Sequence, residues 1–179
     1  MIFISGVHGV GKSFFCDKVN AELGIDTHSA SKLISERKNA GFSSDKLIPD
    51  IDDNQLYLLA AVQELNAADR QYLLDGHFCL LNAEGQITRI PLETFTSLRP
   101  DTIVLLTEKP NVIAARRKQR DGIDHDANDI RHFQDEEISY AKEVAEALGV
   151  PIKISEGVGD FNNMLDFVQA TTRRGKDGR

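Results

Sequence analysis

Residues Gly6 to Ser13 constrain this chain more than any other stretch, because they match the phosphate-binding pattern G-x-x-x-x-G-K-[ST]. A short run of β-branched and aromatic residues precedes the pattern at residues 1–5, and a helix is predicted after it at residues 14–23. Strand, glycine loop and helix therefore follow one another in the order that the motif requires. Glycines let successive backbone N–H groups point at a phosphate, and the positive end of the helix dipole adds to the attraction. The sequence predicts a triphosphate site here, although an ordinary glycine turn would be the alternative.

Each residue of this motif has a predicted role in binding ATP with Mg²⁺. Lys12 would reach the β- and γ-phosphates of ATP, and Ser13 would hold the Mg²⁺ ion. The remaining contacts to the nucleotide are expected from the loop and the first helical turn, at Gly6, His8, Gly9, Val10, Gly11 and Phe14.

The composition is that of an ordinary globular protein of 179 residues, with 41% hydrophobic and 27% charged residues. We expect one domain over residues 1–172 and a flexible basic tail at residues 173–179, which has no apolar face. The net charge of −7 argues against a nucleic-acid binder, which normally has an excess of lysine and arginine. The first strand is predicted at the N-terminus, no apolar run approaches about 18 residues, and two cysteines are too few for a disulfide scaffold. We therefore expect a cytoplasmic protein without a membrane span.

Predicted strands and helices alternate along the chain. Strands are expected at residues 1–5, 25–27, 71–75, 102–106 and 150–154. Helices are expected at residues 14–23, 29–39, 49–68, 91–98, 110–121, 129–148 and 160–171. Residues 78–90 are expected to form a small antiparallel ribbon, because a turn with a glycine separates two short apolar runs. The alternation predicts an α/β fold with a largely parallel sheet and helices on both faces.

A second motif, Asp75-Gly76-His77, follows the third predicted strand. Ligands of such sheets bind at the carboxyl ends of the strands, so Asp75 would lie near the glycine loop and order Mg²⁺ directly or through water. The alternative is a turn residue at the end of a strand. His77 would contact a substrate phosphate or base, transfer a proton, or serve only as a hydrogen-bonded structural residue.

A third feature is a basic helix that contains Arg116 and Arg120 at a spacing of i,i+4, which puts both guanidinium groups on one face. Arginine stabilises the charge that spreads over a phosphoryl group during transfer. The polar residues 122–128 that follow would close as a short lid. A solvated basic helix end is the alternative.

Together these motifs and their order resemble the P-loop nucleoside and nucleotide kinases over about residues 1–155, with a layout similar to the archaeal-type adenylate kinases. The chain also resembles small bacterial proteins described as ATP-binding or predicted kinases, which share the sequence around Asp75. The resemblance implies a three-layer P-loop NTPase fold with a five-stranded parallel core. It further implies a small helical acceptor-binding region, an arginine-bearing lid and MgATP-dependent phosphorylation.

One departure from the adenylate kinase pattern concerns the acceptor. Those enzymes carry a Gly-Asp-x-Leu-Arg type of sequence where this chain has Ala30-Ser31-Lys32-Leu33-Ile34, so the arginine that binds the acceptor phosphate is absent. Lys32 or Arg37 would have to replace it, and lysine lacks the bidentate fork. A base would be bound by Gln55 with its neighbour Asn54, or by Gln134 from the lid side, and the alternative is that each of these is an ordinary helix residue.

The predicted function is transfer of the γ-phosphoryl group of ATP to a small acceptor, a nucleoside monophosphate or a nucleoside. Lys12, Asp75, Arg116 and Arg120 would be the catalytic residues. The expected partners are ATP and this acceptor, not nucleic acid or membrane. The alternative is an ATP-binding switch or sensor that acts on a protein partner, and the sequence leaves the acceptor and the oligomeric state open.

Overall fold

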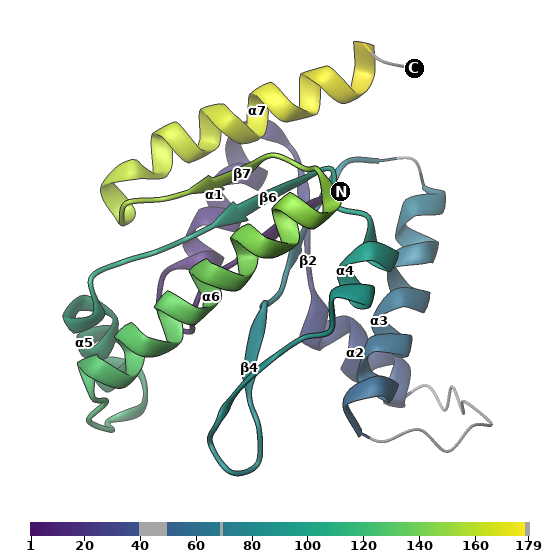
Figure 1. Cartoon of the computed structure of the whole chain (residues 1–179). Coiled ribbons are helices and arrows are strands. Elements are labelled where there is room, and N and C mark those ends of the chain that lie inside the picture. Colours follow the sequence, from purple (N-terminus) through teal and green to yellow (C-terminus); the bar gives the residue numbers. More distant parts are fainter. Residues whose placement is uncertain (40–49, 69, 178–179) are drawn as a thin grey trace.

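A parallel sheet forms the centre of the computed structural model, which describes residues 1–39, 50–68 and 70–177. Its five strands stand in the order β2-β3-β1-β6-β7, and every neighbouring pair is parallel. Figure 1 shows the sheet between its covering helices. The strands are β1 (Ile2–Ser5), β2 (Asp26–Ser29), β3 (Tyr72–Asp75), β6 (Thr102–Leu105) and β7 (Ile152–Ile154).

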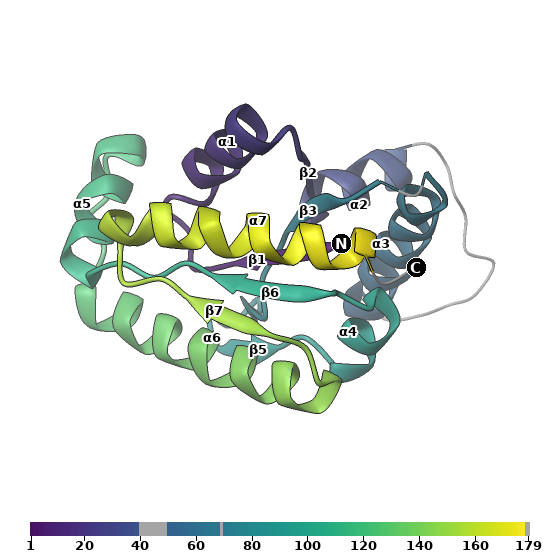
Figure 2. The ribbon, with the colours of Figure 1, turned by 90° about the horizontal axis from the view of Figure 1, so that it is seen from above.

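Helices cover both faces of this sheet. Helices α1 and α7 pack on one face, and α6 runs along the other face, where α3 and α4 also contribute to the core (Figure 2). The helices are α1 (Lys12–Leu23), α2 (Ala30–Asn39), α3 (Asp50–Ala67), α4 (Leu92–Leu98), α5 (Pro110–Asp121), α6 (Ala127–Leu148), α7 (Phe161–Asp177) and the short 3₁₀ helix η1 (Val158–Asp160). None of the helices described is both long enough and apolar enough to cross a membrane.

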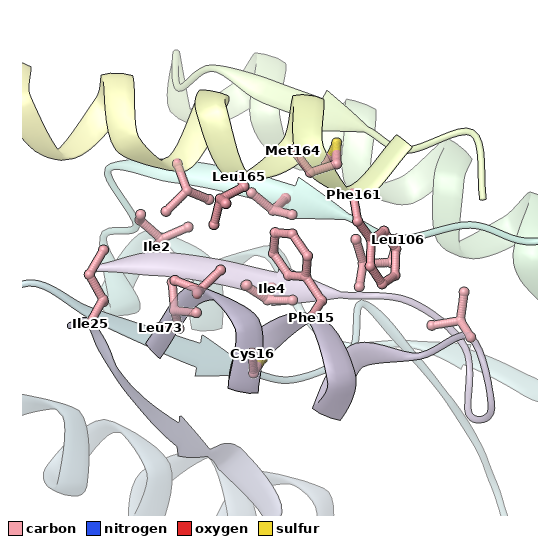
Figure 3. Close-up of a cluster of buried hydrophobic side chains, with 14 of the residues drawn as sticks. Ile2, Ile4, Phe15, Cys16, Ile25, Leu73, Leu106, Phe161, Met164 and Leu165 are labelled. Carbon is pink, nitrogen blue, oxygen red and sulfur yellow. The ribbon is translucent and has the colours of Figure 1, made fainter. Parts of the chain in front are cut away.

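Two apolar clusters hold the layers together. In Figure 3, Phe15 of α1 meets Phe161 and Leu165 of α7 around Ile4 of β1. The second cluster lies on the opposite face and includes buried residues of α3, α4 and α6. Strands buried on both faces need continuous apolar runs, and the burial of all four residues of β1 and of β6 fits this requirement. The predicted α/β fold with a five-stranded parallel sheet is therefore confirmed.

A two-stranded antiparallel sheet, β4 (Cys79–Leu81) with β5 (Ile87–Arg89), projects beside the main sheet. Its turn is closed by Asn82, whose side-chain oxygen accepts the backbone N–H of Gln86 at 2.8 Å. The predicted ribbon at residues 78–90 is confirmed. In Figure 1 this hairpin lies between α5 on one side and the α2–α3 pair on the other.

The C-terminal helix differs from its predicted range. Helix α7 continues to Asp177, whereas the sequence predicted that the helix would end near residue 171 and that a tail would begin at residue 173. Backbone hydrogen bonding propagates a helix once its packed part has formed, so residues without an apolar face can extend it. The flexibility expected for this tail stays a prediction.

Candidate active site

A cavity of about 700 Å³ opens beside the ends of β1 and β3. Its wall is formed by the glycine loop, by residues of α2, α3, α4 and α5, and by the segment that follows β3. This is the position at which ligands bind in parallel α/β sheets, and the volume is in the range of small-molecule sites. The cavity therefore brings the glycine loop and the second motif into one site.

Two glycines of the loop have positive φ angles that residues with a side chain rarely adopt. Gly6 has φ +143°, and a Cβ atom there would lie 2.5 Å from the carbonyl oxygen of Leu106. Gly9 has φ +83°, and a Cβ atom there would lie 3.1 Å from the Cγ of Arg117. Both glycines thus allow the loop to approach neighbouring backbone and side chains closely before α1 begins at Lys12.

Lys12 connects the loop to the end of β3. Its Nζ donates to the carbonyl oxygen of Gly6 at 2.6 Å, and lies 3.3 Å from Nε2 of His77 and 3.6 Å from Oδ1 of Asp75. The side chain is 9% exposed. Burial lowers the pKa of Lys12, and the negative charges of Asp75 and Glu137 oppose that effect. The lysine is therefore a partly desolvated cation held where two motifs meet.

Asp75 faces the same cavity and is partly buried, with 24% of its side chain exposed. Burial raises the pKa of Asp75, whereas the nearby charge of Lys12 lowers it. Ser13 lines the cavity too, so a hydroxyl and a carboxylate oxygen are available in one site. Mg²⁺ in phosphate sites is usually held by one or two such oxygens together with the phosphates, so these residues fit it. No group of three or more His, Cys, Asp or Glu suited to a metal occurs in the described part of the chain.

The rings of His77 and His8 lie next to each other near the lysine, with centroids 4.6 Å apart and ring planes tilted by 49°. Burial lowers the pKa of His77 to about 2, assisted by the charge of Lys12 and by His8. Burial and Lys12 also lower the pKa of His8. Because a group with so low a pKa is neutral and weakly basic near pH 7, His77 suits a contact role better than a proton-accepting role.

Helix α5 lays arginine side chains against the glycine loop. Arg116 donates from Nη1 to the carbonyl oxygen of Val10 at 3.1 Å, and its Nη2 lies 3.3 Å from Oε2 of Glu108. Arg117 donates from Nε to the carbonyl oxygen of His8 at 2.8 Å. These bonds hold two guanidinium groups at the loop that would bind phosphate.

The third arginine of this helix, Arg120, also lines the cavity, and its Nη2 lies 3.1 Å from Oδ2 of Asp121. The sequence predicted roles for Arg116 and Arg120 and none for Arg117. Arg117 stands three residues before Arg120, so the same helical periodicity places it on the cavity side. That i,i+3 spacing is the signal that could have identified it.

Glu137 of α6 is a buried carboxylate that the sequence interpretation missed. Its Oε1 accepts from the hydroxyl of Ser5 and from the N–H of Phe78 at 3.0 Å, and its Oε2 accepts from the N–H of Cys79 at 2.7 Å. Oε1 also lies 3.9 Å from Nδ1 of His77. Burial raises the pKa of Glu137, and the hydrogen bonds oppose this shift. The residue fixes the chain that follows β3 to the end of β1.

A signal for Glu137 was present in the sequence. It occupies the buried stripe of α6, which repeats at intervals of three and four residues, so a charged residue interrupts an otherwise core-facing pattern. The buried residues of this stripe are Ile130, Gln134, Glu137, Ala141 and Val144.

Two of the residues considered for the acceptor, Asn54 and Gln55, line the cavity. Their side-chain oxygens Oδ1 and Oε1 are buried, and neither accepts a hydrogen bond from the described residues. Lys32 and Arg37 of α2 do not line it. Lys32 pairs with Glu36 on its own helix at 3.8 Å, and Arg37 pairs with Glu64 of α3.

Gln134 and Phe14 also lie outside the cavity wall. The amide of Gln134 makes two hydrogen bonds of 3.1 Å to the backbone N–H and C=O of Glu108. Phe14 is 61% exposed, with its ring centroid 6.0 Å from that of Phe161. Val10 is buried in the apolar cluster under α1 and α7, and its carbonyl oxygen accepts from Arg116.

A family model described as an AAA domain matches residues 5–134. A comparison with curated proteins gives no significant match. Among solved structures, the chain is similar to a gluconokinase from Sinorhizobium meliloti, with 17% identity and a TM-score of 0.53 over 97% of this chain and 91% of that chain. It is also similar to a sugar kinase from Janibacter sp., with 14% identity and a TM-score of 0.56 over 96% of this chain and 93% of that chain. An uncharacterized protein from Eubacterium ventriosum matches with 13% identity and a TM-score of 0.53 over 94% of this chain and 95% of that chain. These similarities confirm the predicted P-loop kinase type of fold.

Proposed function

Because the chain belongs to the AAA domain family that its residues 5–134 match, we propose that it is an ATP-dependent kinase that transfers the γ-phosphoryl group of ATP to a small acceptor. The observation that supports this most is the position of Lys12, within 3.6 Å of Asp75 and bonded to the glycine loop at 2.6 Å. A cation in a partly desolvated site stabilises the charge of a transferring phosphoryl group. The solved sugar kinases with this fold are consistent with the proposal.

The residues have separable tasks in this proposal. Lys12 and the loop amides bind the triphosphate, and Arg116 and Arg120 stabilise the charge on the transferring group. Ser13 and Asp75 would hold Mg²⁺, which neutralises charge on the β- and γ-phosphates. Arg117 joins this set, because it contacts the same loop.

The cavity also has to position an acceptor. Its wall extends from the glycine loop to α2, α3 and α4, so one continuous volume is available to both substrates. Holding two reactants in contact range accounts for a large part of enzymatic rate acceleration. As the sequence predicted, we propose a nucleoside monophosphate or a nucleoside as the acceptor.

The proposed location is the cytoplasm. Both cysteines, Cys16 and Cys79, are buried free thiols. Unpaired cysteines persist in a reducing compartment, which agrees with this location. Nucleic acid and membrane are not among the proposed partners.

Lys12→Met tests the proposal directly, because methionine keeps much of the buried stem and removes the charge. We expect kcat for ADP formation to fall at least about 100-fold in the presence of a suitable acceptor. Lys142→Met on the exposed surface of α6 is the matched control and should leave the rate unchanged. Turnover by Lys12→Met at the rate of the unmodified protein would refute the proposal, provided that both variants unfold at similar temperatures.

The switch or sensor alternative gives a different result in the same assay. A sensor would bind ATP without transferring phosphate to any acceptor. A switch would hydrolyse ATP only when a protein partner is added. ADP formation that requires a small acceptor separates the kinase from both.

A further inference from the structure

A largely buried carboxylate connects helix α5 with the loop that leads from β7 into α7. Glu108 lies between β6 and α5, and 12% of its side chain is exposed. Its Oε2 lies 3.3 Å from Nη2 of Arg116 and accepts from the backbone N–H of Val158 at 3.4 Å. One carboxylate therefore contacts both an arginine beside the glycine loop and the loop after β7.

Glu108 is itself held in place by its neighbours. The side-chain amide of Gln134 accepts from the backbone N–H of Glu108 and donates to its carbonyl oxygen, both at 3.1 Å. Oε1 of Glu108 accepts from the backbone N–H of Lys109 at 2.9 Å. A Cβ atom on Gly157 would lie only 3.1 Å from the same Oε1, so a glycine there lets the backbone approach the carboxylate closely. The position of the carboxylate is thus fixed from α6, from α5 and from the loop after β7.

The guanidinium of Arg116 has anchors at both of its terminal nitrogens. Nη1 donates to the carbonyl oxygen of Val10 at 3.1 Å and lies 3.5 Å from that of Gly9. Nη2 is the nitrogen that faces Glu108. The arginine side chain is 37% exposed, and a long side chain with a single anchor retains much of its rotamer freedom. The second anchor therefore fixes the plane of the guanidinium, which is the property that distinguishes arginine from a point charge.

The charge of Glu108 has the opposite effect on a nucleotide. A carboxylate near a triphosphate repels it, so Glu108 by its charge alone weakens the binding of ATP. Its benefit to the site must come from the geometry that it imposes on Arg116. This matters for turnover, because a displacement of about 1 Å in an active site can reduce the rate about 100-fold.

We propose that Glu108 is a positioning residue, which orients Arg116 toward the transferring phosphoryl group and holds the loop after β7 against α5. It acts through Arg116 and does not contact the substrates. This inference rests on the proposed kinase function and adds to it a residue outside the phosphate-binding motif.

A double-mutant cycle with Glu108→Ala and Arg116→Ala tests the inference, because it separates orientation from charge. Loss of the carboxylate changes the electrostatic potential in either background, whereas loss of orientation has an effect only where Arg116 is present. We expect Glu108→Ala to lower kcat at least about tenfold in the otherwise unmodified protein and less than about twofold in Arg116→Ala. KM for ATP should not rise in Glu108→Ala, because a repulsive charge has been removed.

Two further variants make the cycle decisive. Glu156→Ala removes an exposed glutamate from the same loop after β7 and should leave kcat and KM unchanged. Glu108→Gln keeps the shape of the side chain and one acceptor oxygen. It replaces Glu108→Ala in the cycle if the alanine variant unfolds more than about 5 °C below the unmodified protein, and a coupling of at least about threefold in kcat is then expected.

The inference and the kinase function fail in different ways. If Glu108→Ala lowers kcat by the same factor in both backgrounds, or leaves kcat unchanged, the positioning role is overturned and the kinase function stands. If the unmodified protein binds MgATP and transfers phosphate to no acceptor, the kinase function is refuted, and the cycle is measured on the Kd of MgATP by calorimetry. A coupling of at least about threefold between the two substitutions would then retain the positioning role, and independent effects would overturn it.

Discussion

Replacing Glu137 with glutamine tests whether this buried carboxylate holds the end of β3 in place. The carboxylate accepts three hydrogen bonds, from the hydroxyl of Ser5 and from the N–H groups of Phe78 and Cys79. Glutamine has nearly the same shape, but one of its two terminal atoms is an NH₂ group that only donates. In either orientation of the amide, at least one buried donor loses its acceptor.

The expected loss in the free energy of unfolding follows from these hydrogen bonds. If the amide oxygen takes the place of Oε1, the N–H of Cys79 faces the NH₂ group and remains unpaired, which costs about 1–3 kcal/mol. The remaining bonds weaken because the acceptor is no longer charged. Relief of the buried charge offsets part of this loss, so the free energy of unfolding should fall by about 2 kcal/mol. For a chain of this length, that lowers Tm by roughly 4–8 °C.

The same variant should affect catalysis more than nucleotide binding. Phe78 and Cys79 follow directly on the motif that contains Asp75 and His77, so a shift there moves the groups beside Lys12. A displacement of about 1 Å in an active site can reduce turnover about 100-fold. We expect kcat to fall by a factor of about 10–100, while KM for ATP changes less than about threefold.

The assay is denaturant and thermal unfolding together with steady-state kinetics, with Glu146→Gln as the matched control. Glu146 lies on the exposed side of α6, so its substitution should change the free energy of unfolding by less than about 0.5 kcal/mol. If Glu137→Gln were as stable and as active as Glu146→Gln, the structural role assigned to Glu137 would be refuted.

The pH dependence of stability provides an independent check on Glu137. Burial raises its pKa above the usual value of 4.5, so between that value and the raised one the folded protein binds more protons than the unfolded chain. The free energy of unfolding therefore declines as pH rises through this window. Glu137→Gln lacks this contribution, so its stability should fall less steeply with rising pH. A steeper decline in the variant would contradict the assignment.

Further predictions concern the loop and helix α5. Arg117→Ala should lower kcat/KM for ATP by about 10–100-fold, because the variant loses the hydrogen bond that orients the His8 carbonyl in the glycine loop and a positive charge beside that loop. Arg131→Ala on the exposed face of α6 should leave kcat/KM unchanged, and equal values for the two variants in steady-state assays would refute the role of Arg117. Gly6→Ala should lower the free energy of unfolding by at least about 2 kcal/mol, since the new Cβ would lie 2.5 Å from a carbonyl oxygen at a φ of +143°. Gly159→Ala meets no atom within 4 Å, so denaturant unfolding of that variant should match the unmodified protein.

Most of the fold was predictable because its signals are local. Continuous apolar runs predicted the buried strands β1, β3 and β6, and the glycine that ends α1 was read correctly from its position. The hairpin at β4 and β5 followed from one glycine turn between two short runs. The order of the strands in the sheet could not be predicted from such local signals, because it depends on contacts between residues that are distant in the chain.

The site was only partly predictable for the same reason. The glycine loop and Asp75 were identified because each follows a strand end, and parallel strands bring their carboxyl ends to one edge. The buried stripe of α6 could have indicated that Glu137 is buried, but the backbone groups that it binds lie more than fifty residues away in the chain, so the sequence could not identify these partners. Lys32, Arg37 and Gln134 were predicted to bind the acceptor, but none of them lines the cavity. The side chains of Lys32 and Arg37 pair with glutamates and that of Gln134 binds the backbone of Glu108, and helical position alone could not distinguish these partners from a ligand.

The arginines of α5 orient the backbone of the glycine loop and also place positive charge beside it. Arg117 binds the carbonyl of His8, and Arg116 binds the carbonyl of Val10. In a trans peptide unit the C=O and the following N–H point in opposite directions, so these bonds turn the N–H groups of Gly9 and Gly11 away from the two arginines. A lysine at either position would keep the charge but lose the fixed planar donor group. The arginine helix and the glycine loop therefore form one unit, in which the side chains of α5 set the peptide orientations on which anion binding depends.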